Sequence, residues 1–415
     1  MSDSAPEVDW GPRQTGLAMV VFGTLPLLAA IGPLVTISGG LFAFRIVCAL
    51  IIVHAILFLM GRERWRPAEV WLAGTTMSFV VAGLLGFGRI SPGSDNPYSE
   101  FLSIVLGLLT ALAARAWQRR MPEIYVVLAR GWVAASLVVC GIAAWEVYTG
   151  FHLPGYLEGA APDPAATFGN PNALAIFLVM ANVWAIPVRR SSGLLWRGST
   201  WVLVLVSAPV MYVTNARLAM VTWLLVVAWS AWLGIRRSRH RLAGVAGALL
   251  PVSAAVAVVA VVPLLLGYVT EISTSGSSGS VREQLTRQGF GFAVEQRGLP
   301  TWPGAFESLM LERGDLEGTA GLVNAHNTWV ELLVQYGALS LLLFFGWMIA
   351  CAATRSGARD ETALAAATLL VLGIVNSSSL DDASFWMFVI TLAIASRTQK
   401  VSTVKSACTP EAVAA

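Results

Sequence analysis

Residues 324–349 read NAHNTWVELLVQYGALSLLLFFGWMI, a short polar stretch followed at once by a long apolar run. The apolar run has the length, about 20 residues, that crosses the hydrocarbon core of a bilayer. The polar stretch places His326, one of four histidines in the chain, at the mouth of the expected helix. It also closes the long polar segment before it, so it marks a border between a membrane-spanning part and an exposed part.

The rest of the chain has the composition of a membrane protein. Of its 415 residues, 56% are hydrophobic and 12% are charged, and the mean hydropathy is +0.69. A soluble protein is about one quarter charged. Apolar runs of membrane-spanning length recur along the sequence. We therefore predict an all-α fold, a polytopic bundle of transmembrane helices, and no nucleic-acid partner.

We expect about twelve spans, at residues 16–37, 40–60, 68–88, 98–118, 124–149, 171–188, 194–213, 216–235, 242–268, 326–349, 361–377 and 383–396. They form a single integral membrane domain that covers residues 1–415. Residues 398–415 are expected to be a disordered cytoplasmic tail. The cysteines show neither metal-binding nor redox spacing.

Basic residues predict the orientation of the bundle. With both termini in the cytoplasm, 19 of the 27 arginines and lysines fall in cytoplasmic segments, and only five fall in outer segments. Basic residues near the ends of spans stay on the cytoplasmic side. This distribution favours an even number of spans with both termini inside.

Two of the expected outer loops are long. Residues 150–170 are acidic and proline-rich and contain no arginine or lysine. Residues 269–325 form a large extracytoplasmic loop between the ninth and tenth spans. It includes a Ser/Gly-rich tract at 273–280, which predicts flexible chain, and an amphipathic helix is expected near Val281–Glu295.

The predicted orientation brings unusual polar residues to the outer side. They are Arg45, Asn170, Asn172, Arg217, Arg282, Arg287, His326, Asn327, Glu331, Asp381 and Asp382. Simpler interpretations exist. An arginine such as Arg45 can extend to the lipid headgroups, and an asparagine at a helix start is often a cap. Glu331 can neutralise an arginine.

Together these residues suit a lipid diphosphate. A guanidinium binds phosphate oxygens with two hydrogen bonds, a helix N-terminus attracts an anion, and a neutral histidine can accept a proton from a hydroxyl. A transporter of an anionic solute is the alternative, although Arg130 and His54 are the main charged or titratable groups expected toward mid-membrane. A structural scaffold is a third possibility.

Three stretches resemble the O-antigen ligase and O-antigen polymerase family of bacterial envelope enzymes. They are 167–175 (TFGNPNALA), 214–217 (TNAR) and 325–337 (AHNTWVELLVQYG). Arg282 stands where the family has a loop arginine. The sequence differs from the family pattern at Ala216, where a serine is usual, and at 298–304, which resembles the family's Gly-x-Gly turn only loosely.

The resemblance implies glycan transfer without a metal ion or other cofactor, at the outer face of a bacterial plasma membrane, with inversion. The donor would be a glycan on undecaprenyl or decaprenyl diphosphate, and the acceptor a glycan, lipid or protein. Arg217 and Arg282 would bind the diphosphate, and His326 would act as base. The expected substrate-binding residues are Arg45, Asn170, Asn172, Arg287, Asn327, Glu331 and Asp382. The motifs leave ligase and polymerase both open.

Overall fold

The structure is a computed structural model that describes residues 12–34, 36–38, 41–59, 65–86, 97–153, 163–191, 193–237, 278–319, 321–354, 358–374 and 380–398. The expected ninth span and nearly all of the C-terminal tail lie outside the described residues. So do residues 269–277, the first part of the large loop.

The described chain is helical except for one small hairpin. Its helices are α1 (Pro12–Ile31), η1 (Gly32–Leu34), α2 (Ala43–His54), which continues as the π-helix η2 (Ala55–Leu59), α3 (Pro67–Gly86), α4 (Pro97–Arg120), α5 (Ile124–Thr149), α6 (Pro171–Ser191), α7 (Leu194–Val213), α8 (Arg217–Arg237), α10 (Ser278–Glu295), α11 (Ala305–Arg313), α12 (Thr328–Ala353), α13 (Arg359–Gly373) and α14 (Ala383–Arg397). The strands β1 (Thr36–Ser38) and β2 (Leu41–Phe42) pair antiparallel.

Six of these helices are long and apolar enough to cross a membrane. They are α3, α5, α7, α12 and the apolar parts of α4 and α6. Shorter apolar helices occur at Thr15–Ile31, Ala43–Leu57, Arg217–Leu233 and Ala383–Arg397. The chain is thus a helical membrane protein. The total of twelve spans stays a prediction.

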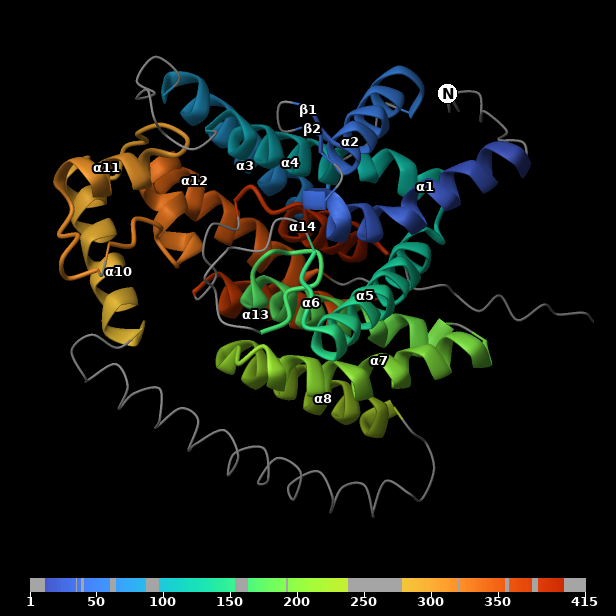
Figure 1. Ribbon diagram of the computed structural model, residues 1–415. Coiled ribbons are helices and arrows are strands. Elements are labelled where there is room, and N and C mark those ends of the chain that lie inside the picture. Colours follow the sequence, from blue (N-terminus) through green and yellow to red (C-terminus); the bar gives the residue numbers. More distant parts are fainter. Residues whose placement is uncertain are drawn as a thin grey trace, which may run out of the picture.

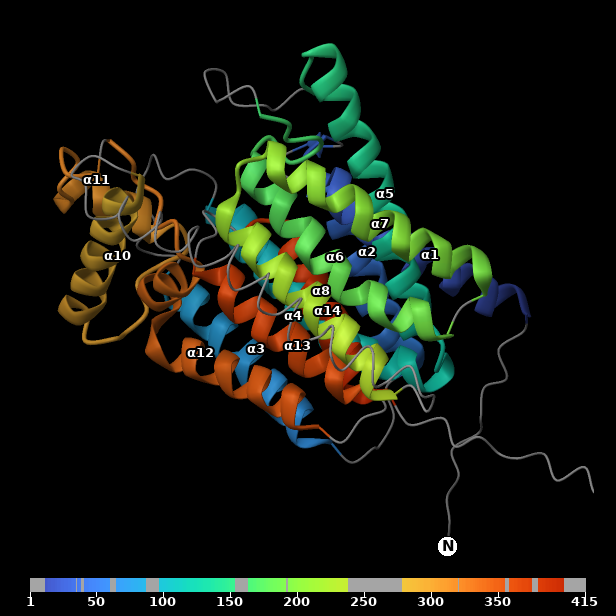
Figure 2. The ribbon, with the colours of Figure 1, turned by 90° about the horizontal axis from the view of Figure 1, so that it is seen from below.

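The helices pack side by side, and Figure 2 shows several of them running the length of the bundle. The Ser103 hydroxyl of α4 donates to the backbone oxygen of Asp381, just before α14, at 3.2 Å. At the opposite end, Arg397 at the end of α14 forms an ion pair with Glu69 at the start of α3. The α4 and α14 helices therefore begin at the end of the bundle where α3 finishes.

Residues 278–319 and 321–325, which we call the lobe, fold against α12 at one side of the bundle (Figure 1). Apolar side chains of α10 and α11 form a small core with the first turns of α12, including Leu285, Phe306 and Val330. The predicted helix near Val281–Glu295 is confirmed, but Ser278–Ser280, predicted to be flexible, form its first turn.

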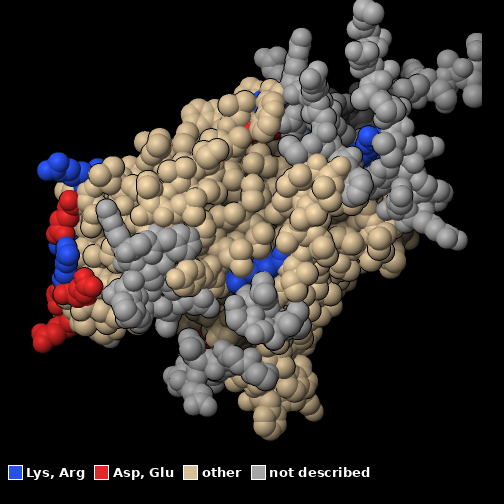
Figure 3. Space-filling model, turned by 90° about the horizontal axis from the view of Figure 1, so that it is seen from above, with Lys and Arg blue, Asp and Glu red and all other residues tan. Residues whose placement is uncertain are grey.

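Charge separates the lobe from the bundle. In Figure 3 the exposed acidic and basic side chains gather at the edge where α10 and α11 lie, while most of the remaining described surface in that view is uncharged. An uncharged surface is what a helix bundle in lipid requires.

Candidate functional site

The polar stretch before α12 is a tight turn. The Asn327 side-chain oxygen accepts hydrogen bonds from the backbone nitrogens of Trp329 at 3.1 Å and Val330 at 3.2 Å. Asn327 is therefore the N-cap of α12. His326 has a φ of +47°, in the left-handed region that costs a non-glycine residue about 1–3 kcal/mol. The turn fixes His326 at the N-terminus of the helix.

The environment of His326 keeps its imidazole neutral. Burial lowers the pKa of His326 to about 4, and the positive charge of Arg282 acts in the same direction. Arg282 comes from the first half of α10 and is half-buried. The structure therefore places Arg282 near enough to act on the charge of His326, and the imidazole is in its neutral form at neutral pH, with one ring nitrogen able to accept a proton.

Arg287, on the same helix, is not brought to His326. Its side chain is 78% exposed and forms an ion pair of 2.9 Å with Glu283, one turn earlier. Residues 282 and 287 are five positions apart, so they point from different faces of a helix with 3.6 residues per turn. The solvent-exposed ion pair accounts for Arg287 without a bound substrate.

Glu331 lies in the first turn of α12 and is only 7% exposed. Its Oε1 atom accepts a hydrogen bond from Gln335 at 3.3 Å, and its buried Oε2 atom has no donor within the described part of the chain. The other charged groups that act on it are carboxyls, those of Glu100, Glu307 and Asp381. The expectation that Glu331 neutralises an arginine therefore finds no support here.

The sequence analysis missed Glu100 and Glu307. Glu100 is in the first turn of α4 and accepts a hydrogen bond of 3.0 Å from the Tyr336 hydroxyl of α12. Glu307 is in the first turn of α11. The available signal was an acidic residue at the start of an otherwise apolar span, but it could not reveal that Glu100 accepts a hydrogen bond from Tyr336.

Arg45 is buried rather than extended toward lipid headgroups. It is 1% exposed, and its guanidinium donates to the hydroxyls of Ser99 at 2.6 Å and Ser103 at 2.6 Å. It also lies 4.0 Å from the ring centre of Phe42. These contacts tie α2 to α4.

Asp382 is the N-cap of α14. Its side chain accepts hydrogen bonds from the backbone nitrogen of Ser384 at 2.8 Å and from the Ser384 hydroxyl. Burial raises the pKa of Asp382 to about 6, and the neighbouring Asp381 adds to this effect. These contacts give Asp382 a structural role at the start of the helix.

The remaining expected residues begin other helices. Asn170 accepts a hydrogen bond of 2.8 Å from the backbone nitrogen of Asn172, across Pro171, the first residue of α6. This is an N-cap with proline at the first helical position. Arg217 is the exposed first residue of α8, after the buried Ala216. The structure thus places these residues on elements other than α10 and α12.

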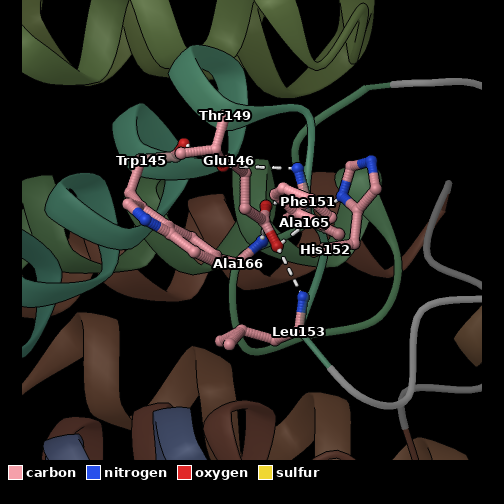
Figure 4. Close-up of polar contacts among 8 residues, drawn as sticks. All are labelled: Trp145, Glu146, Thr149, Phe151, His152, Leu153, Ala165 and Ala166. Atoms are coloured by element: carbon pink, nitrogen blue, oxygen red, sulfur yellow. Dashed lines mark hydrogen bonds and ion pairs between the residues drawn. The ribbon is translucent and has the colours of Figure 1, made fainter.

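A buried carboxylate organises the chain before α6 (Figure 4). Glu146, near the end of α5, accepts hydrogen bonds from the backbone nitrogens of Leu153 at 3.2 Å, Ala165 at 2.9 Å and Ala166 at 2.7 Å. His152 lies 3.6 Å from the same carboxylate. The beginning and the end of the segment that connects α5 to α6 are thereby both bonded to α5. The sequence analysis did not single out Glu146.

The α12 helix is broken at Gly337, whose φ is +81°. The break leaves backbone groups that bond to the lobe: Ala338 nitrogen donates to the Gly298 oxygen at 2.9 Å, and Thr301 nitrogen donates to the Gln335 oxygen at 3.1 Å. The segment 298–304, which resembles the family turn only loosely in sequence, therefore fastens the lobe to α12.

The site is separate from the cavity at the opposite end of the bundle. That cavity has a volume of about 340 Å³ and lies beside the Arg397–Glu69 ion pair. Among the described residues, no group of three or more histidine, cysteine, aspartate or glutamate side chains is arranged to hold a metal ion.

One segment of the chain is similar to a known protein family. Residues 201–345 match a family model described as O-antigen ligase. This segment is similar to the O-antigen ligases. The match runs from α7 to the middle of α12 and includes Arg217, Arg282 and His326, whereas Asn170 and Asn172 lie before it. The resemblance to the O-antigen ligase family is thereby confirmed over these residues. No curated protein matches the chain.

Proposed function

We propose that the protein transfers a glycan from a polyprenyl-diphosphate carrier to an acceptor hydroxyl at the extracytoplasmic membrane face. The match to the O-antigen ligase family supports a membrane glycan ligase or polymerase. The observation that carries the finer proposal is the neutral imidazole of His326 beside the guanidinium of Arg282, at the N-terminus of α12.

This arrangement suits the proton transfer of the reaction. The acceptor oxygen forms a bond to the anomeric carbon of the donor, and the bond from that carbon to the diphosphate oxygen breaks. An unprotonated imidazole nitrogen of His326 takes the acceptor proton as the new bond forms. Attack from the face opposite the leaving group inverts the anomeric centre.

The leaving diphosphate gains negative charge during this step. The guanidinium of Arg282 and the N-terminus of α12 supply positive potential for it. We assign Arg217 to the same diphosphate, because it is an exposed basic residue at another helix start within the family match. Asn170 and Asn172 would contact the sugars.

The distribution of basic residues supports a plasma-membrane protein with cytoplasmic termini and the lobe outside. In that orientation the starts of α6, α8 and α12 all face the extracytoplasmic side. A lipid-linked glycan exposed on that side would reach each of them.

Gene deletion followed by complementation tests the proposal. We expect the deletion to accumulate a polyprenyl-diphosphate glycan, detected by thin-layer chromatography and mass spectrometry, and to lack a surface glycan. Arg217→Ala, Arg282→Ala and His326→Ala should fail to restore the profile, since losing one group that stabilises developing charge costs a factor of about 10²–10³.

Arg287→Ala is the matched control, because it removes the same side chain from the same helix at a solvent-exposed position. It should restore the profile. If Arg217→Ala, Arg282→Ala and His326→Ala also restore it at normal expression, the transferase proposal fails and transport of an anionic solute becomes the better hypothesis.

A further inference from the structure

We propose that the cavity beside the Arg397–Glu69 ion pair binds an anionic phospholipid, with an acyl chain inside the cavity and the phosphate at its rim. The cavity has a volume of about 340 Å³. Ligand-binding pockets typically have volumes of about 300–1,000 Å³. The inference goes beyond the proposed glycan transfer and does not depend on it, because the cavity shares no residue with the polar stretch before α12.

Four helices form the walls of the cavity. They are the first turns of α3, the second half of α4 and the last turns of α12 and α14. Each helix contributes alanine to the lining, at Ala68, Ala111, Ala350, Ala353 and Ala393. An alanine side chain is a single methyl group, so the helices leave between them a space that their own side chains do not fill.

The interior of the cavity is apolar. Leu72, Ala111 and Trp347 line it and are buried. The two hydroxyl groups in the lining donate to backbone oxygens of their own helices, Thr354 at 2.6 Å and Ser396 at 2.8 Å. A buried water needs two to four polar partners. The interior therefore suits a hydrocarbon chain better than it suits water.

The cavity opens at the surface of the bundle. Pro67 and Ala353 line it and are exposed, whereas Trp347, on the same helix as Ala353, is buried. A rise of 1.5 Å for each residue separates Ala353 from Trp347 by about 9 Å along α12. The cavity thus leads from an exposed opening to a buried apolar end, the form that an acyl chain requires.

The rim of the cavity carries charged side chains. Arg397 forms an ion pair with Glu69. The Arg66 guanidinium donates to the backbone oxygen of Arg397 at 3.1 Å, and the Arg66 backbone nitrogen donates to the Glu69 carboxylate at 2.8 Å. These three side chains carry two positive charges and one negative charge. The surplus positive charge favours an anion, and a guanidinium is well suited to phosphate oxygens.

The neighbouring surface favours a phospholipid as the source of this anion. Trp65, directly before Arg66, is 49% exposed, and tryptophan is enriched at the membrane–water interface, at the level of the headgroups. Val70 and Ile349 present exposed apolar side chains on α3 and α12, where a second acyl chain can lie outside the cavity. In the proposed orientation this end faces the cytoplasm, where basic pockets between transmembrane helices bind anionic headgroups.

Native mass spectrometry of the purified, delipidated full-length protein tests the charge of the ligand. Phosphatidylglycerol and phosphatidylcholine with the same acyl chains are the probes. We expect phosphatidylglycerol to bind about fivefold more tightly, the contribution of roughly one basic residue at a membrane surface. Arg66→Gln should abolish this preference, because it leaves the rim neutral and keeps the Arg397–Glu69 ion pair. Arg66→Lys should retain it.

Filling the cavity tests where the lipid binds. Ala350→Leu adds three carbon atoms to the lining and should weaken phosphatidylglycerol binding about tenfold or more, the loss expected when about two methylenes are kept out of the cavity. Ala367→Leu is the matched control, because it adds the same atoms at an exposed position of α13 outside the cavity. Should Ala350→Leu not fold, Ala393→Leu on α14 serves in its place.

Three outcomes overturn the inference. The first is equal binding of phosphatidylglycerol and phosphatidylcholine to the wild type, which would show a site without charge selection. The second is equal binding of phosphatidylglycerol to the cavity-filling variant and to Ala367→Leu, which would place the lipid elsewhere. The third is tighter binding of palmitate than of phosphatidylglycerol, which would identify a free fatty acid as the ligand.

Discussion

At the scale of single residues, the proposed transfer requires His326 to be in its neutral form. A solvent-exposed histidine has a pKa near 6.5, whereas burial and Arg282 bring that of His326 to about 4. As pH falls through 6.5, His326 therefore remains neutral and keeps its capacity to accept a proton. It loses that capacity only near pH 4.

Replacing Arg282 tests whether its positive charge lowers the pKa of His326. We expect Arg282→Gln to raise the pKa of His326 toward its ordinary value, because one of the two effects that disfavour the imidazolium is removed. Deuterium exchange at the imidazole C2 position, followed by mass spectrometry across pH, measures the pKa. Arg287→Gln should leave it unchanged, and an equal rise in both variants would show that Arg282 does not act on His326.

A second residue-scale prediction concerns Glu146. Glu146→Gln replaces one carboxylate oxygen with an NH2 group, which cannot accept a hydrogen bond, so at least one of the three backbone N–H groups loses its partner. We expect a loss of about 1–3 kcal/mol in local stability, seen as faster hydrogen exchange at Leu153, Ala165 and Ala166. Glu123→Gln, an exposed position at the other end of α5, is the control. Unchanged exchange in Glu146→Gln would contradict the prediction.

At the scale of elements, α12 packs against both the lobe and the helix bundle. Its first turns pack against the lobe through Val330 and Val334 and also against α3, where the Tyr336 ring lies 4.9 Å from the Phe79 ring. Its second part packs into the bundle core. Gly337 separates them, because its left-handed conformation interrupts the helix. The helix is therefore one apolar element by sequence and two helical segments in the structure.

The variant Gly337→Ala tests this division. An added Cβ would lie 2.9 Å from the Gly298 oxygen and 2.9 Å from the Pro300 nitrogen, and the φ of +81° strains any L-residue. We expect a stability loss of about 1–3 kcal/mol, measured by reversible denaturation, with faster proteolysis of the lobe. Gly141→Ala in α5 is the control, because nothing lies within 4 Å of the added atom. Equal stability of both variants would contradict the division.

At the scale of the whole molecule, the two ends of the bundle face opposite compartments in the proposed orientation. Labelling of introduced cysteines tests which end of the bundle faces the outside of the cell. We expect Glu295→Cys in the lobe to react with an impermeant maleimide in intact cells, and Leu194→Cys at the start of α7, where Leu194 is 87% exposed, to react only after permeabilisation. Cys408 would first be replaced, since Cys48, Cys140 and Cys351 are buried. The reverse pattern would invert the orientation.

Much of the fold follows from apolar periodicity and length, which is why 124–149 and 194–213 coincide with α5 and α7. Motif residues such as Asn327 and His326 also have local signatures. Contacts between distant elements do not: nothing near Glu100 in the sequence points to Tyr336. The lobe was expected to begin as flexible chain because its helix starts in a Ser/Gly tract.

The attachment of the lobe at Gly337 has a mechanical consequence. If the lobe lifts from the bundle, the nitrogen of Ala338 and the oxygen of Gln335 lose their partners at Gly298 and Thr301. Each buried group left in this way costs about 1–3 kcal/mol unless α12 straightens at the same time. Separation of the lobe from the bundle would therefore break both bonds at Gly337 and would move Arg282 relative to His326.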